Sequence, residues 1–322
     1  MIDGRRWPPF VRLPGSAQRV WMRKYPHQVF IQSSSPQPKR RLHATLRTRR
    51  CAVAATMGEW PLVTKIAPSA RERGAGEFTG ATLEKASQCM RTDGTLILED
   101  IVEPALIREV REAFVQRYDR YLDRREHDDA LQAGNRRLMI TVDLEPPFER
   151  RELIANPWLC PILSAAFQGE FVLAAYGVVC SLPGASRQPI HQDGGDIFPQ
   201  AGLNRLLPTF AVTVGIPLLE MNEIHGTTAL WPGSHRDETR ASANDGIEPL
   251  VREGSCVVWD YRLRHGGTAN RSAVPRPLLY MTYCRPWFLD HKNYRRQAPL
   301  PKHTLENLPD DLRALLIRAQ EY

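Results

Sequence analysis

The sequence lacks the cysteine pairs, nucleotide-binding loops and long apolar runs that identify several large classes of protein. Its six cysteines are scattered and include no C-x-x-C pair, so neither a zinc knuckle nor a dithiol redox pair is indicated. The absence of G-x-G-x-x-G and Walker loops weighs against nucleotide-binding α/β folds. The sequence contains no run of about 18 apolar residues, the length needed to span a membrane. Its N-terminus also lacks the apolar h-region of a secretory signal peptide. We therefore predict a soluble, cytoplasmic protein with reduced thiols.

Acidic residues are almost absent from the first part of the chain. Residues 1–56 contain twelve Lys or Arg and one acid, Asp3. This segment therefore carries +11 of a chain whose net charge is +7, which leaves −4 on the remainder. Phosphate binding requires a basic face on the folded domain itself, so we do not expect a nucleic-acid partner.

Residues 1–56 also lack a sustained hydrophobic period and contain the run SSSPQPKRR. We predict a disordered basic extension for this segment. Two related explanations stay open. Met57 directly before GEWPLV is consistent with a start codon assigned too far upstream, and the Arg-rich, acid-poor composition also fits an organelle transit segment. Residues 57–322 are predicted to form a single domain.

From Gly94 onward the sequence shows the patterns of regular secondary structure. Residues 94–102 predict a short strand, 103–126 have apolar residues at helical spacing, and 156–167 predict a second helix. Runs rich in β-branched and aromatic residues then predict strands over 171–182, 208–219, 227–232, 254–263 and 276–288. Helices followed by closely spaced strands indicate the α+β class, with a β-sandwich or barrel at its centre.

The stretch RQPIHQDGGDIF contains a histidine and an aspartate two positions apart. On a strand, His191 and Asp193 project from the same face while Gln192 points away, so both side chains can reach one ion. An imidazole and a carboxylate are two ligands of the 2-His-1-carboxylate triad of non-haem iron, which leaves positions open for a cosubstrate and dioxygen. A second copy, His127 and Asp129, lies in a charged helical segment, and we interpret it as solvated surface.

Three histidines are candidates for the remaining ligand: His225, His235 and His265. His235 follows Pro-Gly-Ser, a turn signal, so it can hydrogen-bond within its own loop. His265 ends a predicted strand, and an antiparallel return after GGTANRSAVP can bring Arg276 beside it. A buried arginine there can bind a dicarboxylate through two parallel hydrogen bonds, with a salt bridge or solvent contact at the strand end as an equal alternative.

Four segments occur in the order that is typical of one enzyme family: DGTLILEDIVEPALIREVR, LPGASRQPIHQD, GTTALWPGSHR and HGGTANRSAVPR. On these motifs, residues 90–288 resemble the phytanoyl-CoA dioxygenase family of iron(II)- and 2-oxoglutarate-dependent oxygenases. The resemblance implies that His191, Asp193 and His265 bind iron(II) and that Arg276 holds the distal carboxylate of 2-oxoglutarate. It also implies a double-stranded β-helix, a cupin-like jelly-roll barrel with flanking α-helices, which agrees with the strands predicted above.

The sequence departs from this resemblance at Gly215, where family members often carry a bulky aromatic residue, so we expect an enlarged pocket there. Thr213 shares the same strand face and could contact the cosubstrate, or could be an ordinary core residue. Asp193 is present, whereas related halogenases lack this carboxylate to make room for halide, so hydroxylation or another oxidation, such as desaturation or ring formation, is expected. The resemblance also assigns His235 to a turn rather than to the metal site.

These features predict a dioxygenase that uses iron(II), 2-oxoglutarate and O2 to hydroxylate an unactivated C–H bond of a small molecule, releasing succinate and CO2. The polar residues Asp196, Asn204 and Arg205 follow the H-x-D segment and could contact the substrate, although the polarity of an exposed loop explains them equally well. A non-catalytic metal- or ligand-binding jelly-roll module is the alternative. A zinc hydrolase is less favoured, because no general base is evident and Arg276 would have no role. The sequence leaves the substrate and the oligomeric state open.

Overall fold

The computed structural model of the chain describes residues 62–122, 130–198, 200, 202–242, 246–290, 300 and 302–319. The predicted extension over residues 1–56 and the second H-x-D copy at His127 and Asp129 lie outside the described residues. No helix among the described residues has the length and apolar character needed to cross a bilayer.

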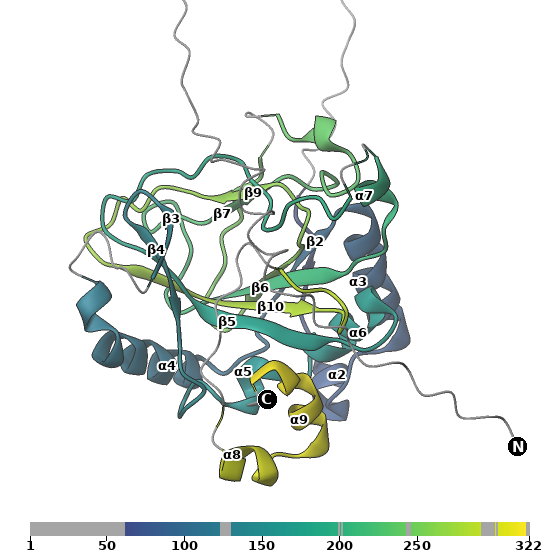
Figure 1. Cartoon of the computed structure of the whole chain (residues 1–322), viewed down its shortest axis with the longest axis horizontal. Helices are drawn as coiled ribbons and strands as arrows, with labels where there is room; N and C mark the ends of the chain where they lie inside the picture. Colours follow the sequence, from purple (N-terminus) through teal and green to yellow (C-terminus); the bar gives the residue numbers. More distant parts are fainter. Residues whose placement is uncertain are drawn as a thin grey trace, which may run out of the picture. The chain divides into compact units, whose positions relative to one another are not determined.

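Two β-sheets form the centre of the fold (Figure 1). The larger has the strand order β1-β2-β8-β6-β10-β5-β4-β3 and is antiparallel apart from the β1–β2 pair. The smaller pairs β7 with β9, and isolated bridges extend it on both sides, from His191 to His265 and from Leu230 to Ile247. The strands are β1 Lys65–Ile66, β2 Thr95–Leu98, β3 Leu131–Gly134, β4 Arg137–Thr141, β5 Val172–Ser181, β6 Ala211–Pro217, β7 Thr228–Leu230, β8 Cys256–Asp260, β9 His265–Gly267 and β10 Arg276–Cys284.

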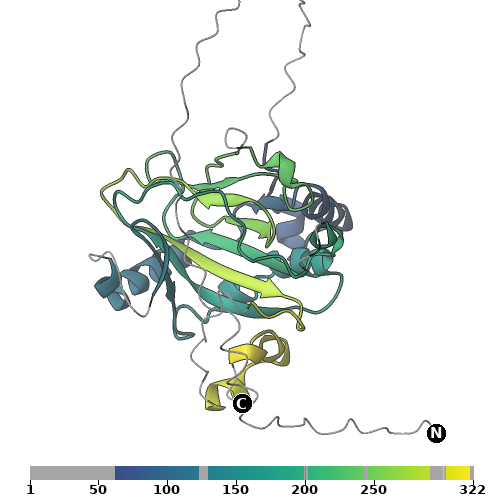
Figure 2. The same cartoon turned by 45° about the horizontal axis from the view of Figure 1, so that its top comes forward.

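Successive strands alternate between the two sheets. From β6 to β10 the chain passes from the large sheet to the small one and back with each strand, and the bridge at His191 provides the same step between β5 and β6. Figure 2 shows the two sheets facing each other. This path is that of a double-stranded β-helix, so the predicted α+β jelly-roll barrel with flanking helices is confirmed.

Each long strand of the large sheet sends alternate side chains to opposite faces, as the two-residue period of a strand requires. On β10, Leu279, Met281 and Tyr283 enter the main hydrophobic core, whereas Leu278 and Tyr280 belong to a second cluster on the other face. Because both faces are buried, β6 and β10 have nearly continuous apolar sequences rather than alternating ones.

Helices cover the face of the large sheet that carries the main core. Met90 of α3, Phe114 of α4, Ile162 of α6 and Leu312 of α9 all join that core cluster. The α-helices are α2 Ala70–Ala75, α3 Gly80–Thr92, α4 Pro104–Arg117, α5 Arg151–Ile154, α6 Leu159–Phe167, α7 Leu203–Leu206, α8 Lys302–Asn307 and α9 Asp310–Leu315. Short 3-10 turns occupy η1 Asp119–Tyr121, η2 Glu238–Arg240 and η3 Ile317–Ala319.

The helix predicted over residues 103–126 is shorter in the structure. It begins with Pro104, where the missing N–H would have no partner in any case, and it ends at Arg117. Tyr118 leaves helical geometry, and its hydroxyl accepts a 2.9 Å hydrogen bond from the amide of Asp143. The apolar spacing of the sequence thus continues past the residue at which the helix ends and a 3-10 turn follows.

Candidate active site

His191 and His265 face each other across a short antiparallel pair. The amide of His191 donates to the carbonyl of His265 at 2.9 Å, and the amide of His265 donates to the carbonyl of His191 at 2.8 Å. This exchange fixes the register of the two segments, so the imidazole rings lie with centroids 4.5 Å apart. Backbone pairing therefore joins two histidines that are far apart in the sequence.

The backbone also orients both imidazole rings. Nδ1 of His191 lies 2.9 Å from the carbonyl oxygen of Pro189, and Nδ1 of His265 lies 2.9 Å from that of Leu263. Donation from each Nδ1–H to its carbonyl selects the tautomer in which Nε2 carries the lone pair. Both histidines are thus prepared to bind a metal through Nε2.

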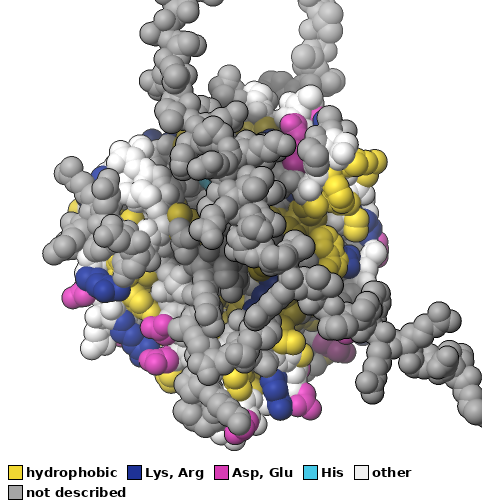
Figure 3. All heavy atoms as spheres, viewed as in Figure 1, with side chains coloured by type: hydrophobic (Ala, Val, Ile, Leu, Met, Phe, Trp, Pro, Cys, Tyr) yellow, Lys and Arg dark blue, Asp and Glu magenta, His cyan; other side chains and the backbone are white. Residues whose placement is uncertain are grey.

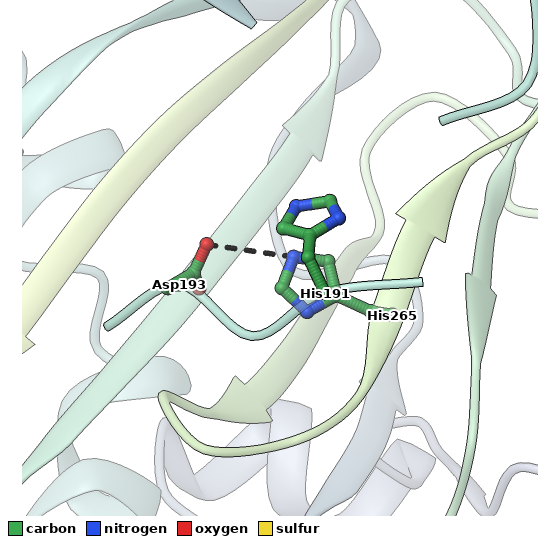
Figure 4. A group of neighbouring side chains, drawn as sticks. All are labelled: His191, Asp193 and His265. Atoms are coloured by element: carbon green, nitrogen blue, oxygen red, sulfur yellow. Dashed lines mark ion pairs between the residues drawn. The ribbon is translucent and has the colours of Figure 1, made fainter. Parts of the chain in front are cut away.

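Asp193 directs one carboxylate oxygen to the histidines and the other to the barrel wall. Oδ2 accepts hydrogen bonds from Trp259 Nε1 at 2.9 Å and from Thr213 Oγ1 at 2.6 Å. Oδ1 lies 3.4 Å from His265 Nε2, the ion pair dashed in Figure 4. Ligand atoms of His191, Asp193 and His265 all lie within 4.8 Å of one another. The three predicted ligands therefore converge.

The charges of these three side chains are coupled. Burial would raise the pKa of Asp193, but His265 and the Thr213 hydroxyl outweigh it and lower that pKa. Burial likewise opposes the cationic form of His265, and the Asp193 carboxylate outweighs it, so the pKa of His265 is raised. Burial lowers the pKa of His191, helped by repulsion from His265. The cluster thus combines an ionised carboxylate with imidazoles of unequal basicity.

Two imidazole nitrogens and one carboxylate oxygen are the donor set of the facial triad that binds iron(II) in oxygenases. The triad lines a cavity of about 410 Å³, which leaves room for further ligands of a metal and for a substrate. A closed structural zinc site would need a fourth protein ligand, and the group among the described residues contains only three. The donor set and its surroundings therefore fit an open, catalytic iron site.

The same cavity contains two buried arginines that no carboxylate of the described residues pairs with. Arg276 begins β10 and Arg137 begins β4, and they are 1% and 0% exposed. Burial lowers the pKa of Arg137 to about 9, with repulsion from Arg276 as a further cause, and lowers the pKa of Arg276 to about 10. Nε of Arg276 is buried without a hydrogen-bond partner among the described residues. Two uncompensated cations and an unsatisfied donor indicate an anion-binding site.

Arg276 was predicted from the sequence, whereas Arg137 and Gln188, which line the same cavity, were not. Gln188 accepts a 2.8 Å hydrogen bond from the amide of Gly267 through Oε1 and donates through Nε2 to the carbonyl of Ala133. Its position three residues before the first ligand histidine was visible in the sequence. Arg137 gave no such signal, because the short strand RLMIT that carries it was not predicted.

Thr213 and Gly215 lie on β6. The Thr213 hydroxyl donates to Asp193, so it has a partner in the metal site, and its contact with the cosubstrate stays a prediction. A Cβ added to Gly215 would lie 3.2 Å from Leu278 Cδ2 and 3.3 Å from Trp259 Cζ3. Leu278 and Trp259 therefore fill the space in which an enlarged pocket was expected.

The other two candidate histidines do not join the triad. Nδ1 of His225 lies 3.0 Å from the carbonyl oxygen of Glu220, and Nε2 of His235 lies 3.3 Å from that of Arg91. His235 lies in a turn, as predicted from Pro-Gly-Ser. His225 thus contacts a nearby carbonyl. His235 instead contacts a residue that is distant in the sequence, not its own loop as expected, and its buried Nδ1 has no hydrogen-bond partner among the described residues.

The polar residues expected near the substrate lie outside the cavity lining. Asn204 orders its own loop, because its Oδ1 accepts hydrogen bonds from the amides of residues 197–198 at 2.9 and 3.1 Å. Asp196 and Arg205 are exposed. Hydrophobic side chains gather around α7 in Figure 3, where Leu206 is 78% exposed. This segment therefore presents an apolar surface and a structural asparagine rather than a polar wall of the cavity.

Comparison with known proteins agrees with this geometry. The family model for phytanoyl-CoA dioxygenase (PhyH) matches residues 90–278, more than half of the chain. The chain belongs to the phytanoyl-CoA dioxygenase family. The resemblance carried by the four sequence motifs is therefore confirmed.

Among curated relatives of this dioxygenase, FrzG of Cladobotryum sp is 24% identical over 217 residues, which are 59% of this chain and 70% of FrzG. The dioxygenase olcK of Penicillium canescens is 25% identical over 252 residues, 75% of this chain and 81% of olcK. Among solved structures, AviO1 of Streptomyces viridochromogenes Tue57 matches with a TM-score of 0.50 and 22% identity, over 64% of this chain and 96% of AviO1. The AviO1 likeness concerns the fold.

Family membership and the three converging ligands establish the class of enzyme. The protein is a non-haem dioxygenase that uses iron(II), 2-oxoglutarate and O2, and the family to which it belongs acts on small molecules. The predicted enzyme class and cosubstrates are thus confirmed.

Proposed function

We propose that iron(II) binds to Nε2 of His191, Nε2 of His265 and Oδ1 of Asp193, and that Arg276 and Arg137 bind the distal carboxylate of 2-oxoglutarate. One observation carries this assignment: a three-ligand metal group and two buried guanidinium groups, without carboxylate partners among the described residues, share one cavity. A dicarboxylate that reaches from the metal to these cations satisfies both.

Bound iron(II) and 2-oxoglutarate supply the activation of dioxygen and two of the electrons that its reduction requires, with succinate and CO2 as products. The chain's own residues hold the reacting groups in place. Trp259 and Thr213 hold Oδ2 of Asp193, so that Oδ1 faces the metal. The carbonyls of Pro189 and Leu263 orient the two imidazoles.

We propose hydroxylation of an unactivated C–H bond of a small molecule as the reaction outcome. Tyr280, Phe288 and Leu289 line the cavity together with the triad, and such a wall favours an apolar substrate portion and excludes water. The carboxylate ligand Asp193 supports hydroxylation over halogenation, because halide would need the coordination position that this carboxylate takes.

We further propose that residues 57–322 are the catalytic domain. The main core contains Ile66 near the start of this span and Ala319 near its end. Side chains from both ends thus pack into one cluster, as a single domain requires.

The test is an anaerobic titration of the full chain with iron(II) and 2-oxoglutarate, followed through the visible charge-transfer band of the chelated cosubstrate. We expect the wild-type band to disappear in His191→Ala and to require higher 2-oxoglutarate concentrations in Arg276→Ala. His225→Ala is the matched control, because this histidine lies outside the triad, and its band should equal that of the wild type.

Folded protein that binds iron(II) but develops no band would overturn the assignment of the cosubstrate site and favour a binding module without turnover. A band that persists in His191→Ala would overturn the assignment of this ligand. With the band established, succinate production in the presence of candidate substrates measures coupled turnover.

A further inference from the structure

A single serine hydroxyl lies between the two buried arginines. Ser181 on β5 is the register partner of Arg276 on β10 and of Arg137 on β4, so the three residues form a row across adjacent strands. Ser181 Oγ accepts a hydrogen bond from Nε of Arg137 and another from Nη2 of Arg276, each 2.8 Å long. A hydroxyl oxygen has two acceptor lone pairs, and these two bonds use both.

The two guanidinium groups depend on this serine to different degrees. Arg137 donates further hydrogen bonds to the carbonyls of Ser186 at 3.3 Å and Thr268 at 2.7 Å. Arg276 has only the thioether sulfur of Met221, a weak acceptor, at 3.2 Å, and its Nε has no partner among the described residues. Ser181 is therefore the one oxygen acceptor among the described residues that holds the Arg276 guanidinium.

We propose that Ser181 is a positioning residue for 2-oxoglutarate, acting through the two arginines whose guanidinium planes it sets. The proposal rests on the proposed function, in which these arginines bind the distal carboxylate. Both arginines line the cavity, whereas Ser181 is fully buried behind its wall. Its effect on a bound anion is therefore indirect.

The geometry of carboxylate recognition explains why such a support matters. A guanidinium binds a carboxylate through two parallel hydrogen bonds, which require a fixed plane. Without the Ser181 acceptor, Arg276 can rotate about its side-chain torsions, and ordering it again on binding costs free energy. Loss of a hydrogen bond to a charged group predicts dicarboxylate binding weaker by about tenfold or more.

The test compares Ser181→Thr with Ser181→Val in the full chain, because threonine and valine have nearly the same shape and differ in the hydroxyl. Succinate and 2-oxoglutarate are titrated into the metal-free protein by calorimetry, and 2-oxoglutarate also into the iron(II)-loaded protein anaerobically. Ser255→Ala is the control, since Ser255 is equally buried and its hydroxyl accepts from the distant amide of Asp100. We expect Ser181→Thr and the control to bind both dicarboxylates like the wild type and Ser181→Val to bind about tenfold more weakly or worse, with iron(II) affinity unchanged.

Equal dicarboxylate affinity in Ser181→Thr and Ser181→Val would overturn this proposal and leave the proposed function intact. A wild-type chain that binds neither dicarboxylate, with or without iron(II), would overturn both, because the arginines would then not form an anion site. Joint loss of iron(II) and dicarboxylate binding in Ser181→Val would overturn the positioning role, since it would indicate a disturbed barrel.

Discussion

The indole nitrogen of Trp259 lies 2.9 Å from Oδ2 of Asp193 and donates a hydrogen bond to it. The same indole packs against His265, with ring centroids 5.2 Å apart. Trp259 therefore contacts two of the three proposed metal ligands while being 2% exposed. Because its N–H holds Oδ2, the carboxylate is restrained to offer Oδ1 alone to a metal.

We expect Trp259→Phe to weaken iron(II) binding by about 10- to 100-fold, the usual effect of removing a partner of a metal ligand. Phenylalanine keeps most of the aromatic packing but loses the N–H donor to Asp193. Anaerobic iron(II) titration measures the dissociation constant. Trp231→Phe is the control, because Trp231 is also buried and donates to the carbonyl of Ser242 instead. Equal iron(II) affinity in the two variants would contradict the role given to Trp259.

Thr213 offers a test between two roles. If its hydroxyl orients Asp193, Thr213→Val should weaken iron(II) binding by about tenfold or more and leave 2-oxoglutarate affinity at saturating iron(II) unchanged. Thr213→Ser, which retains the hydroxyl, should behave like the wild type in both titrations. The opposite pattern, a loss confined to 2-oxoglutarate affinity, would instead support direct contact with the cosubstrate.

Gly215→Ala should destabilise the fold by about 1–3 kcal/mol, because the added methyl group overpacks a filled space. The new Cβ would lie 3.2 Å from Leu278 and 3.3 Å from Trp259. Urea unfolding measures the change. Gly195→Ala provides the control, since its Cβ meets nothing within 4 Å, and its effect should stay within about 0.5 kcal/mol. Leu278→Ala combined with Gly215→Ala should cost less than the sum of the two single changes, because each relieves the other's packing error.

Asp260 and Arg262 form a buried ion pair that fixes the chain between β8 and β9. Nε of Arg262 lies 2.8 Å from Oδ1 of Asp260, and both side chains are less than a tenth exposed. Removing one partner leaves the other buried and unpaired, so Asp260→Asn should cost about 3–5 kcal/mol in urea unfolding. The exposed pair of Arg151 and Asp311 is the control, and Asp311→Asn should cost at most about 1 kcal/mol.

The same pair predicts a pH dependence of stability. Burial would raise the pKa of Asp260, but the Arg262 guanidinium outweighs it and lowers that pKa in the folded state. The stabilisation is therefore complete above the unfolded value of about 3.9 and is lost as pH falls through the folded pKa. Unfolding free energies of the wild type and Asp260→Asn should converge as pH falls below about 4. A constant difference between them would contradict this linkage.

The H-x-D spacing and the run of strands predicted a sandwich or barrel with His191 and Asp193 as candidate ligands, whereas the choice of His265 and Arg276 came from the resemblance to the enzyme family. The spacing and strand patterns are local signals, because strand periodicity and turn chemistry depend on neighbouring residues. Arg137 could not be predicted in the same way. It reaches the cavity only because β4 pairs with β5 in the register that sets Arg137 opposite Ser181. Register between distant strands depends on the folded sheet rather than on a short stretch of sequence.

Loop polarity was also a poor guide to the substrate region. Asn204 follows the H-x-D segment closely, and its side chain was a candidate for contact with the substrate. In the structure its side-chain amide forms hydrogen bonds with the backbone of its own loop. Asparagine hydrogen-bonds local backbone readily, and whether it does so is decided by the loop conformation. A polar residue near a ligand in sequence therefore says little about where its side chain points.

The backbone pairing of His191 with His265 has a consequence for how long the barrel stays closed. The two residues belong to distant parts of the chain, and a metal ion bound by both would link those parts reversibly. Separating the two segments would then require losing the ion as well as their backbone hydrogen bonds, whereas the metal-free chain loses the hydrogen bonds alone. Under iron starvation the protein would be both inactive and degraded faster, because the metal-free barrel opens more often and exposes its strands to proteases.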